Sequence, residues 1–190
     1  INAESSPLSV AQDVGRVLGD GVAQAMDEVI VDLFNSGAIT EAGPGAGAEL
    51  TVEHIMKGIA TLRSASVPMT GLVCVLHPKQ AFNVKKTLLN AGGSLSNNEL
   101  ANQAAREYFV GRIAGCDIYE SASIDIDGSD DAVGAVFHPQ AIGLVMKRDL
   151  RIATQRDESA RATEVVASAA FGAARLSNAK IAKLTSDAAL

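Results

Sequence analysis

Three histidines and two cysteines are the side chains that could carry catalysis or bind a metal. His54, His77 and His138 are the only histidines among 190 residues, and Cys74 and Cys116 are the only cysteines. No two of them have the spacing of a zinc site, such as Cys-x-x-Cys or His-x-x-x-His. His77 and His138 each precede a proline at the end of an expected strand, where an imidazole can bond to backbone groups of the turn. We therefore expect no metal, no cofactor and no catalytic residue.

Two short segments have the composition, but not the spacing, of ligand-binding loops. Segment 43–47 (GPGAG) is rich in glycine, yet it lacks the Lys-Ser/Thr ending of a phosphate-binding P-loop. Segment 124–131 (IDIDGSDD) is acidic, yet the glycine and the final glutamate of a calcium loop are not at their required places. No Gly-x-Ser-x-Gly nucleophile elbow occurs. The sequence therefore predicts a flexible loop and a solvated acidic turn, and it supplies no enzyme motif.

Composition and charge narrow the class of protein further. The formal net charge is −6, which argues against a surface that follows nucleic-acid phosphates, although an acidic wall can lie beside DNA and repel it. Hydrophobic residues make up 47% and aromatic residues only 4%, so we expect a core of aliphatic side chains and alanine. Such a core buries less area per residue, and contacts with partner chains should contribute to stability. No apolar run approaches the roughly 18 residues of a membrane span, and no signal peptide is recognisable.

The first element that the pattern predicts is a long amphipathic helix from about Ser9 to Phe34. Asp13, Asp20 and Asp27 recur every seven residues on one face, and Arg16 has the spacing of surface ion pairs with the first two. The apolar stripe of the opposite face comprises Val10, Val14, Val17, Leu18, Val22, Met26, Val29 and Leu33.

Three glycines lie inside this helix. Gly15, Gly19 and Gly21 each cost a helix about 1 kcal/mol relative to alanine. We expect the close approach of another backbone to offset that cost.

An α/β segment follows the glycine-rich loop. Thr51 is placed to cap a helix that runs to about 62, and a proline opens a second helix at 78. Strands are expected at 71–76, 112–113, 117–119 and 132–137, and a further helix at 98–109. Cys74 and Cys116 lie in apolar runs, which predicts buried, reduced thiols. The residues expected to point inward from the two helices are Val52, Ile55, Met56, Ile59, Leu62, Phe82, Leu88 and Leu89.

The remainder of the chain is rich in strands. Long antiparallel strands are expected at 142–146, 150–155 and 162–171, with a last short strand at 181–184. Basic Lys147, Arg148, Arg151 and Arg156 alternate with acidic residues and no aromatic ones, which favours ion pairing within or between subunits over nucleic-acid binding. The order of elements predicts an α+β fold in which the long helix and these strands pack together and the middle is an inserted lobe.

Four segments together resemble the major capsid proteins of tailed bacteriophages of the Hong Kong 97 type. MDEVIVDLFNSG (26–37) resembles the end of that family's spine helix, and VPMTGLVCVLHP (67–78) the start of its axial domain. GRIAGCDIYES (111–121) is similar to the family's G-x-x-x-G-x-x-(V/I)-x-x-S segment. Segment 160–176 is similar to the strand that returns to the peripheral domain.

The resemblance implies a structural protein that assembles into pentamers and hexamers and forms an icosahedral shell around double-stranded phage DNA. It implies a peripheral domain with the spine helix (1–52), an axial domain (53–140) and a return to the peripheral domain (141–190). DNA would be enclosed without sequence-specific binding, with a cement or scaffold protein as a candidate partner and no membrane contact. The protein would assemble in the bacterial cytoplasm and reside in the virion. The residues we expect at subunit interfaces are Asp13, Arg16, Asp20, Asp27, Arg148, Arg151 and Arg156.

Two other functions stay open at this stage. An encapsulin-like nanocompartment protein would share the fold and enclose a cargo enzyme. A small soluble α/β enzyme would use His77 or His138. The resemblance also implies an N-terminal arm and an extended loop before the spine helix, whereas only about eight residues precede the expected helix here. We therefore expect either that those parts are cut or omitted, or that the chain is a fragment.

Overall fold

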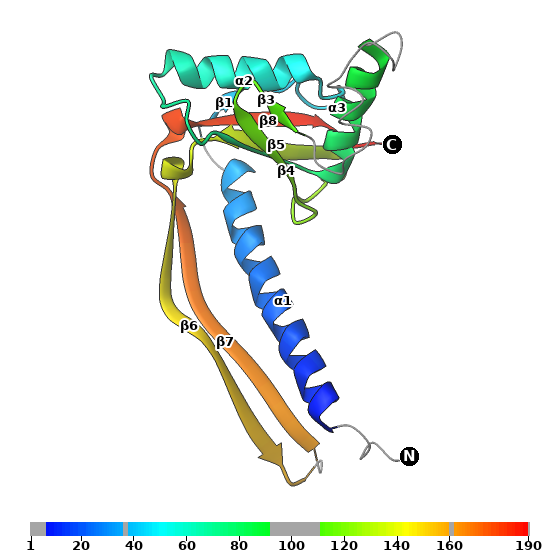
Figure 1. Ribbon diagram of the computed structural model, residues 1–190, viewed down its shortest axis with the longest axis vertical. Helices are drawn as coiled ribbons and strands as arrows, with labels where there is room; N and C mark the ends of the chain where they lie inside the picture. Colours follow the sequence, from blue (N-terminus) through cyan, green and yellow to red (C-terminus); the bar gives the residue numbers. More distant parts are fainter. Residues whose placement is uncertain (1–6, 36–37, 92–110, 160–161, 190) are drawn as a thin grey trace. The chain divides into compact units, whose positions relative to one another are not determined.

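A computed structural model of the protein describes residues 7–35, 38–91, 111–159 and 162–189. These ranges contain three α-helices and eight β-strands (Figure 1), which confirms the α+β class expected from the sequence. The helices are α1 (Pro7–Asn35), α2 (Val52–Ser64) and α3 (Pro78–Ala91). The strands are β1 (Thr40–Glu41), β2 (Val73–Leu76), β3 (Arg112–Ile113), β4 (Cys116–Glu120), β5 (Asp131–Phe137), β6 (Ile142–Asp157), β7 (Ala162–Arg175) and β8 (Ile181–Asp187). Short 3₁₀ turns η2 (Pro139–Ala141) and η3 (Asn178–Lys180) precede β6 and β8.

The chain divides into two compact units. The helix–hairpin unit comprises Ile1–Val29 and Leu144–Ala173, and the sheet unit comprises Ile30–Gly143 and Ala174–Leu190. The sheet unit thus combines the segment between the long helix and the hairpin with the C-terminal segment that follows the hairpin. The three-part division into peripheral, axial and return segments, with boundaries at 52 and 140, stays a prediction.

The sheet unit is built on a six-stranded mixed sheet with the order β1-β8-β5-β2-β4-β3. Its longest pairing is the antiparallel pair of β5 and β8, whose register runs from Asp131 opposite Asp187 to Phe137 opposite Ile181. Both edge strands, β1 and β3, have only two residues. Edges this short offer little backbone to a foreign strand, which protects the sheet from edge-to-edge aggregation.

Hydrophobic side chains form a core on each face of this sheet. On one face, α2 packs over β5 and β8, and the aliphatic cluster there, to which α3, β2 and β4 also contribute, includes Ile55, Leu62, Leu76 and Ile118. On the other face, Val31 and Phe34 from the last turns of α1 join residues of β5 and β8. The rings of Phe34 and Phe137 are 5.3 Å apart. The core is mainly aliphatic, as the low aromatic content predicted.

Two inward positions expected from the sequence are wrong. Met56 on α2 is 52% exposed and Phe82 on α3 is 51% exposed. In α2 the buried stripe follows Ile55, Ile59 and Leu62, and Met56 lies about 100° around the helix from Ile55. In α3 the inward face is set by smaller neighbours of Phe82, namely Ala81 and Val84. The side chains of Leu88 and Leu89, and the helix expected at 98–109, lie outside the described residues.

The helix–hairpin unit contains α1 and a two-stranded antiparallel sheet of β6 and β7 (Figure 1). The helix spans 29 residues, close to the expected bounds. The sequence predicted separate strands at 142–146 and 150–155, and that prediction is wrong, because β6 is one strand of 16 residues. Three consecutive charged residues, Lys147 to Asp149, interrupt the hydrophobicity, but their side chains extend to both faces of an exposed strand and do not end it. None of the helices in the described ranges combines the length and apolar character that a membrane span requires.

Candidate functional site

The helix–hairpin unit has no core of its own. Every buried residue in the described ranges belongs to the sheet unit, and none lies among the described side chains of 13–29, 144–159 and 164–173. A chain segment that long without a buried side chain gains little from the hydrophobic effect, which is the main stabilising term in folding. Its surface is therefore the first place to look for a binding partner.

Strand β6 exposes a row of large apolar side chains. All residues from Leu144 to Asp157 are exposed, with Leu150 at 44% and Val145 at 70%. Since successive side chains of a strand point to opposite faces, the even-numbered apolar residues share one face. They are Leu144, Met146, Leu150 and Ile152. Only the charged residues of this strand were expected at an interface, although apolar residues at even positions are a readable signal of an amphipathic strand.

The acidic face of α1 is also uncovered. Asp13, Arg16, Asp20 and Asp27 are all exposed, and no ion pair joins any of them to another described residue. The spacing that suggested pairs of Arg16 with its two aspartates is present, but the pairs are not formed. The helix carries five acidic side chains and one basic one, a net charge of −4.

No backbone of the described residues outside α1 lies close to the glycines of α1. A Cβ atom added at Gly15, Gly19 or Gly21 would meet nothing within 4 Å. The expectation that close packing offsets their cost is therefore wrong for contacts inside one chain. Val17 on the same helix is 67% exposed, although the sequence placed it on the buried stripe.

The basic residues of the hairpin are exposed as well. Arg148 and Arg151 form no ion pair with a described residue, whereas Arg156 Nε lies 2.6 Å from Glu158 Oε1. With four basic and two acidic side chains, β6 has a net charge of +2. The structure thus gives α1 and β6 opposite charges but does not join the residues expected at subunit interfaces. Their role as interface residues stays a prediction.

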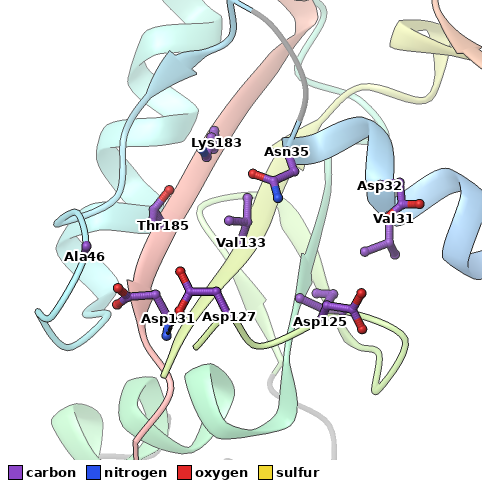
Figure 2. A pocket seen from close by; sticks show the side chains of 11 residues that line it. Val31, Asp32, Asn35, Ala46, Asp125, Asp127, Asp131, Val133, Lys183 and Thr185 are labelled. Atoms are coloured by element: carbon purple, nitrogen blue, oxygen red, sulfur yellow. Dashed lines mark hydrogen bonds between the residues drawn. The ribbon is translucent and has the colours of Figure 1, made fainter. Parts of the chain in front are cut away.

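A polar pocket of about 250 Å³ lies in the sheet unit (Figure 2). Its carboxylates bond to nearby backbone groups. Asp127 Oδ1 accepts the N–H groups of Ser129 at 2.8 Å and Asp131 at 2.9 Å, and Asp131 Oδ1 accepts that of Gly47 at 2.7 Å. These bonds shape the acidic turn that the sequence predicted. In the described part of the chain, no group of three or more His, Cys, Asp or Glu side chains is arranged to hold a metal ion.

All three histidines bond to the backbone where a helical turn starts. Nδ1 of His77 accepts the N–H of Lys79, and Nδ1 of His138 accepts that of Gln140, each at 3.2 Å. Nδ1 of His54 accepts the N–H of Thr51 at 3.2 Å. The expected role of the two His-Pro pairs is thus confirmed. Burial, and to a lesser degree the charge of Lys79, lowers the pKa of His77.

Both cysteines are free and buried, as predicted. Burial raises the pKa of the Cys74 thiol well above its usual value, and the neighbouring Cys116 raises it further. Burial, followed by the charge of Asp117, raises the pKa of Cys116 to about 12, against the opposing effect of Arg112. Both thiols are therefore protonated at neutral pH and are poor nucleophiles.

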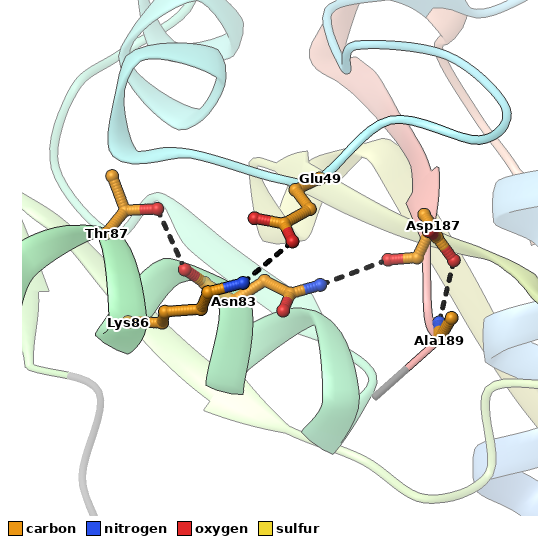
Figure 3. Close-up of polar contacts among 6 residues, drawn as sticks. All are labelled: Glu49, Asn83, Lys86, Thr87, Asp187 and Ala189. Atoms are coloured by element: carbon orange, nitrogen blue, oxygen red, sulfur yellow. Dashed lines mark hydrogen bonds and ion pairs between the residues drawn. The ribbon is translucent and has the colours of Figure 1, made fainter.

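Polar contacts fix α3 to the end of β8 and to the loop before α2 (Figure 3). Lys86 Nζ lies 2.8 Å from Glu49 Oε1, and Asn83 Nδ2 donates to the backbone oxygen of Asp187 at 3.4 Å. Asp187 Oδ1 in turn accepts the N–H of Ala189 at 2.7 Å. These contacts hold α3 against its neighbouring segments, and the polar groups of these residues bond to one another.

Comparison with known proteins identifies the fold of the chain. Neither a protein-family model nor a curated protein matches the sequence. A structure from Mycobacterium phage Che8 superposes with a TM-score of 0.73 at 20% identity, covering 92% of this chain and 62% of that one. The capsid structure of cyanophage P-SCSP1u gives a TM-score of 0.65 at 16% identity, covering 92% and 65%. The holo-SrpI encapsulin complex from Synechococcus elongatus gives 0.68 at 11% identity, covering 99% and 70%.

The chain has the α+β fold of Hong Kong 97-type capsid proteins, as its resemblance to that family implied. At identities of 20% and below, the likeness is one of fold. The chain spans 62% and 65% of the length of the two phage proteins.

Proposed function

We propose that this chain is the shell-forming part of a major capsid protein of a tailed bacteriophage, which assembles into pentamers and hexamers and then into an icosahedral shell. The observation that carries the proposal is the helix–hairpin unit without a single buried side chain in its described parts. The sheet unit has a core on both faces and is complete as a folded body. The helix–hairpin unit needs neighbours, and a shell of identical copies supplies them.

The exposed apolar residues of β6 can supply enough energy for association. Fully burying a Val, Leu, Ile or Met side chain is worth about 1.5–3 kcal/mol. Five such residues on β6 are at least 44% exposed, so their complete burial would contribute several kcal/mol per contact. Association costs roughly 4–15 kcal/mol in lost freedom, so one contact of this kind is weak. Repetition around a ring and across a shell makes such weak contacts sufficient.

Within this proposal the two units take different roles. The sheet unit forms the axial domain around the centre of each capsomer, and the helix–hairpin unit forms the peripheral domain between capsomers. The expected peripheral residues 1–52 and 141–190 include α1, β1, β6, β7 and β8. The expected axial residues 53–140 include α2 apart from its first residue, α3 and β2 to β5. Contacts place β1 and β8 in the sheet unit, so we propose that both strands belong to the axial body.

The net charge of the chain supports DNA as the content of the proposed shell. A net charge of −6 suits a wall that encloses DNA and does not bind it, because like charges repel at short range. We propose that the protein assembles in the bacterial cytoplasm, resides in the virion, and has no catalytic role. A scaffold or cement protein is a further candidate partner.

A second candidate is a nanocompartment shell that encloses a cargo protein. The specific observation in its favour is the match to an encapsulin complex over 99% of this chain. The contents of particles purified from the native host separate the two. Encapsidated double-stranded DNA supports the phage capsid, and a stoichiometric protein cargo without DNA supports the nanocompartment.

Light scattering after size-exclusion chromatography tests whether the exposed strand drives association. We expect the wild-type protein to form species of at least five copies. Ile152→Glu replaces an apolar residue that is 51% exposed and should shift the population towards monomers. The matched control, Gln155→Glu, adds the same charge to the same strand without removing apolar surface and should assemble normally. Equal assembly of wild type and Ile152→Glu would contradict the role of this surface.

A further inference from the structure

We infer that neighbouring copies bind head to tail, with the acidic stripe of α1 in one copy against the basic segment 147–151 of β6 in the next. The inference rests on the proposed function and specifies the partner surface. The acidic stripe is Asp13, Asp20 and Asp27, and the basic segment carries Lys147, Arg148 and Arg151 around a single acidic residue, Asp149.

Charge complementarity selects these two surfaces for each other. The net charge of α1 is −4 and that of β6 is +2. The three aspartates and the three basic residues are exposed, and no ion pair in the described chain uses any of them. Opposite charges that stay unpaired within one copy are available to pair between copies.

The spacing of the charges is compatible with this contact. Asp13 and Asp20 are seven helical residues apart, about 10.5 Å at a rise of 1.5 Å per residue. Lys147 and Arg151 share a face of the strand and are about 13 Å apart at 3.3 Å per residue. The flexible lysine and arginine stems are long enough to take up the difference.

Apolar surface surrounds the charges on both partners. On β6 the exposed Val145 shares the face of Lys147 and Arg151, whereas Met146, Leu150 and Ile152 share the face of Arg148. On α1 the exposed Val14 and Val17 lie beside the acidic stripe, and no described atom would obstruct a Cβ at the nearby glycines. Burial of the apolar residues would supply affinity, and the charges would set the orientation and exclude wrong alignments.

Because the two surfaces differ, the contact is heterologous. Heterologous contacts generate rings when the rotation between copies closes, and open filaments when it does not. A head-to-tail contact of α1 with β6 therefore fits the formation of five- and six-membered rings from one kind of chain.

Complementary charge reversal tests the inference. The helix-reversed variant is Asp13→Lys/Asp20→Lys/Asp27→Lys, and the hairpin-reversed variant is Lys147→Glu/Arg148→Glu/Arg151→Glu. Each variant alone should assemble at least about tenfold less than wild type, because like charges then face each other. Mixed one to one, they should assemble again, since copies that alternate around a ring present opposite charges at every contact.

The mixture has a second, geometric signature. Alternation is consistent only in rings with an even number of copies, so the mixture should form six-membered and not five-membered rings. A chain with both reversals should form both kinds. Circular dichroism and cooperative unfolding verify that each variant retains the sheet unit. Should a reversed variant misfold, wild-type assembly over a salt series provides the test, because screening should slow it several-fold between low and physiological ionic strength.

Other outcomes would overturn the inference in distinguishable ways. If the chain with both reversals assembles but the mixture does not, the charges pair within a copy. If either single variant assembles like wild type, or the salt series has no effect, the charges do not set the contact. In all these cases the shell function stands. If wild type itself does not assemble, the proposed function fails.

Discussion

The side-chain Nε2 of Gln80 on α3 lies 2.8 Å from Ser186 Oγ on β8, which joins two elements separated by 106 residues of sequence. The same nitrogen lies 2.9 Å from the backbone oxygen of Ala132, and Gln80 Oε1 accepts the N–H of His77 at 3.1 Å. Gln80 and Ser186 are both completely buried. These hydrogen bonds of the buried Gln80 amide fix α3 on the sheet. Any shift of α3 would break them and leave buried polar groups unpaired.

Replacing Gln80 by leucine should therefore destabilise the sheet unit strongly. The substitution preserves side-chain volume but leaves up to three buried groups without their partner, each at about 1–3 kcal/mol. We expect a loss of roughly 3 kcal/mol in the free energy of unfolding, measured by urea denaturation. The control Ser186→Ala removes one bond and should cost about 1 kcal/mol. Equal losses for the two variants would contradict the central role of the Gln80 amide.

Two glycines of the sheet unit should respond in opposite directions to alanine. A Cβ at Gly43 would lie 2.5 Å from the backbone oxygen of Thr185, so Gly43→Ala must displace β1 from β8 and should cost about 1–3 kcal/mol. At Gly58 in α2 the nearest atom would be 3.5 Å away, an ordinary contact. Gly58→Ala should raise the free energy of unfolding by about 0.5–1 kcal/mol through helix propensity. Urea denaturation of both variants checks the signs, and a stable Gly43→Ala protein would refute the close approach.

The two thiols should be inert in the folded protein. Burial raises the pKa of both cysteines, that of Cys116 to about 12, so neither forms an appreciable thiolate at pH 8. We expect no alkylation by iodoacetamide until urea unfolds the sheet unit, and then two labels per chain by mass spectrometry. Labelling of either cysteine in native conditions would show that the region around β2 and β4 opens.

Stability should depend on pH through His77. Because the pKa of His77 is lowered in the fold, the neutral form is favoured there. Its contribution to stability is fully present above the unfolded value of about 6.5, and it is lost as the pH falls from there through the lower folded pKa. His77→Asn keeps an acceptor for the N–H of Lys79 but does not titrate. Thermal melts between about pH 6.5 and 5 should have a shallower slope for the variant, and identical slopes would contradict the assignment.

Local signals in the sequence predicted most helices and strands of the described chain. The apolar repeat placed α1 within two residues of its start at Pro7, and Thr51 marked the start of α2 as its N-cap. The His-Pro pairs marked two turns because proline at a first helical position is a local preference. Charged residues with ion-pair spacing marked α1, although the expected pairs of Arg16 with Asp13 and Asp20 are not formed among the described residues.

Other features depend on contacts that no local pattern encodes. The parallel pairing of β1 with β8 joins Thr40 to Ala182, and only the folded sheet brings them together. Met56 and Phe82 are apolar residues on amphipathic helices. They are exposed because neighbouring residues of the same helices pack against the sheet. The expectation for the glycines of α1 was wrong because the sequence pattern of a helix does not specify whether its glycines are covered within the chain.

Negative-stain electron microscopy of the purified protein at high concentration tests the central claim most directly. The shell-forming function predicts rings with five- and sixfold symmetry, or closed shells built from them. Monomer-sized particles alone, at every concentration reached, would contradict it.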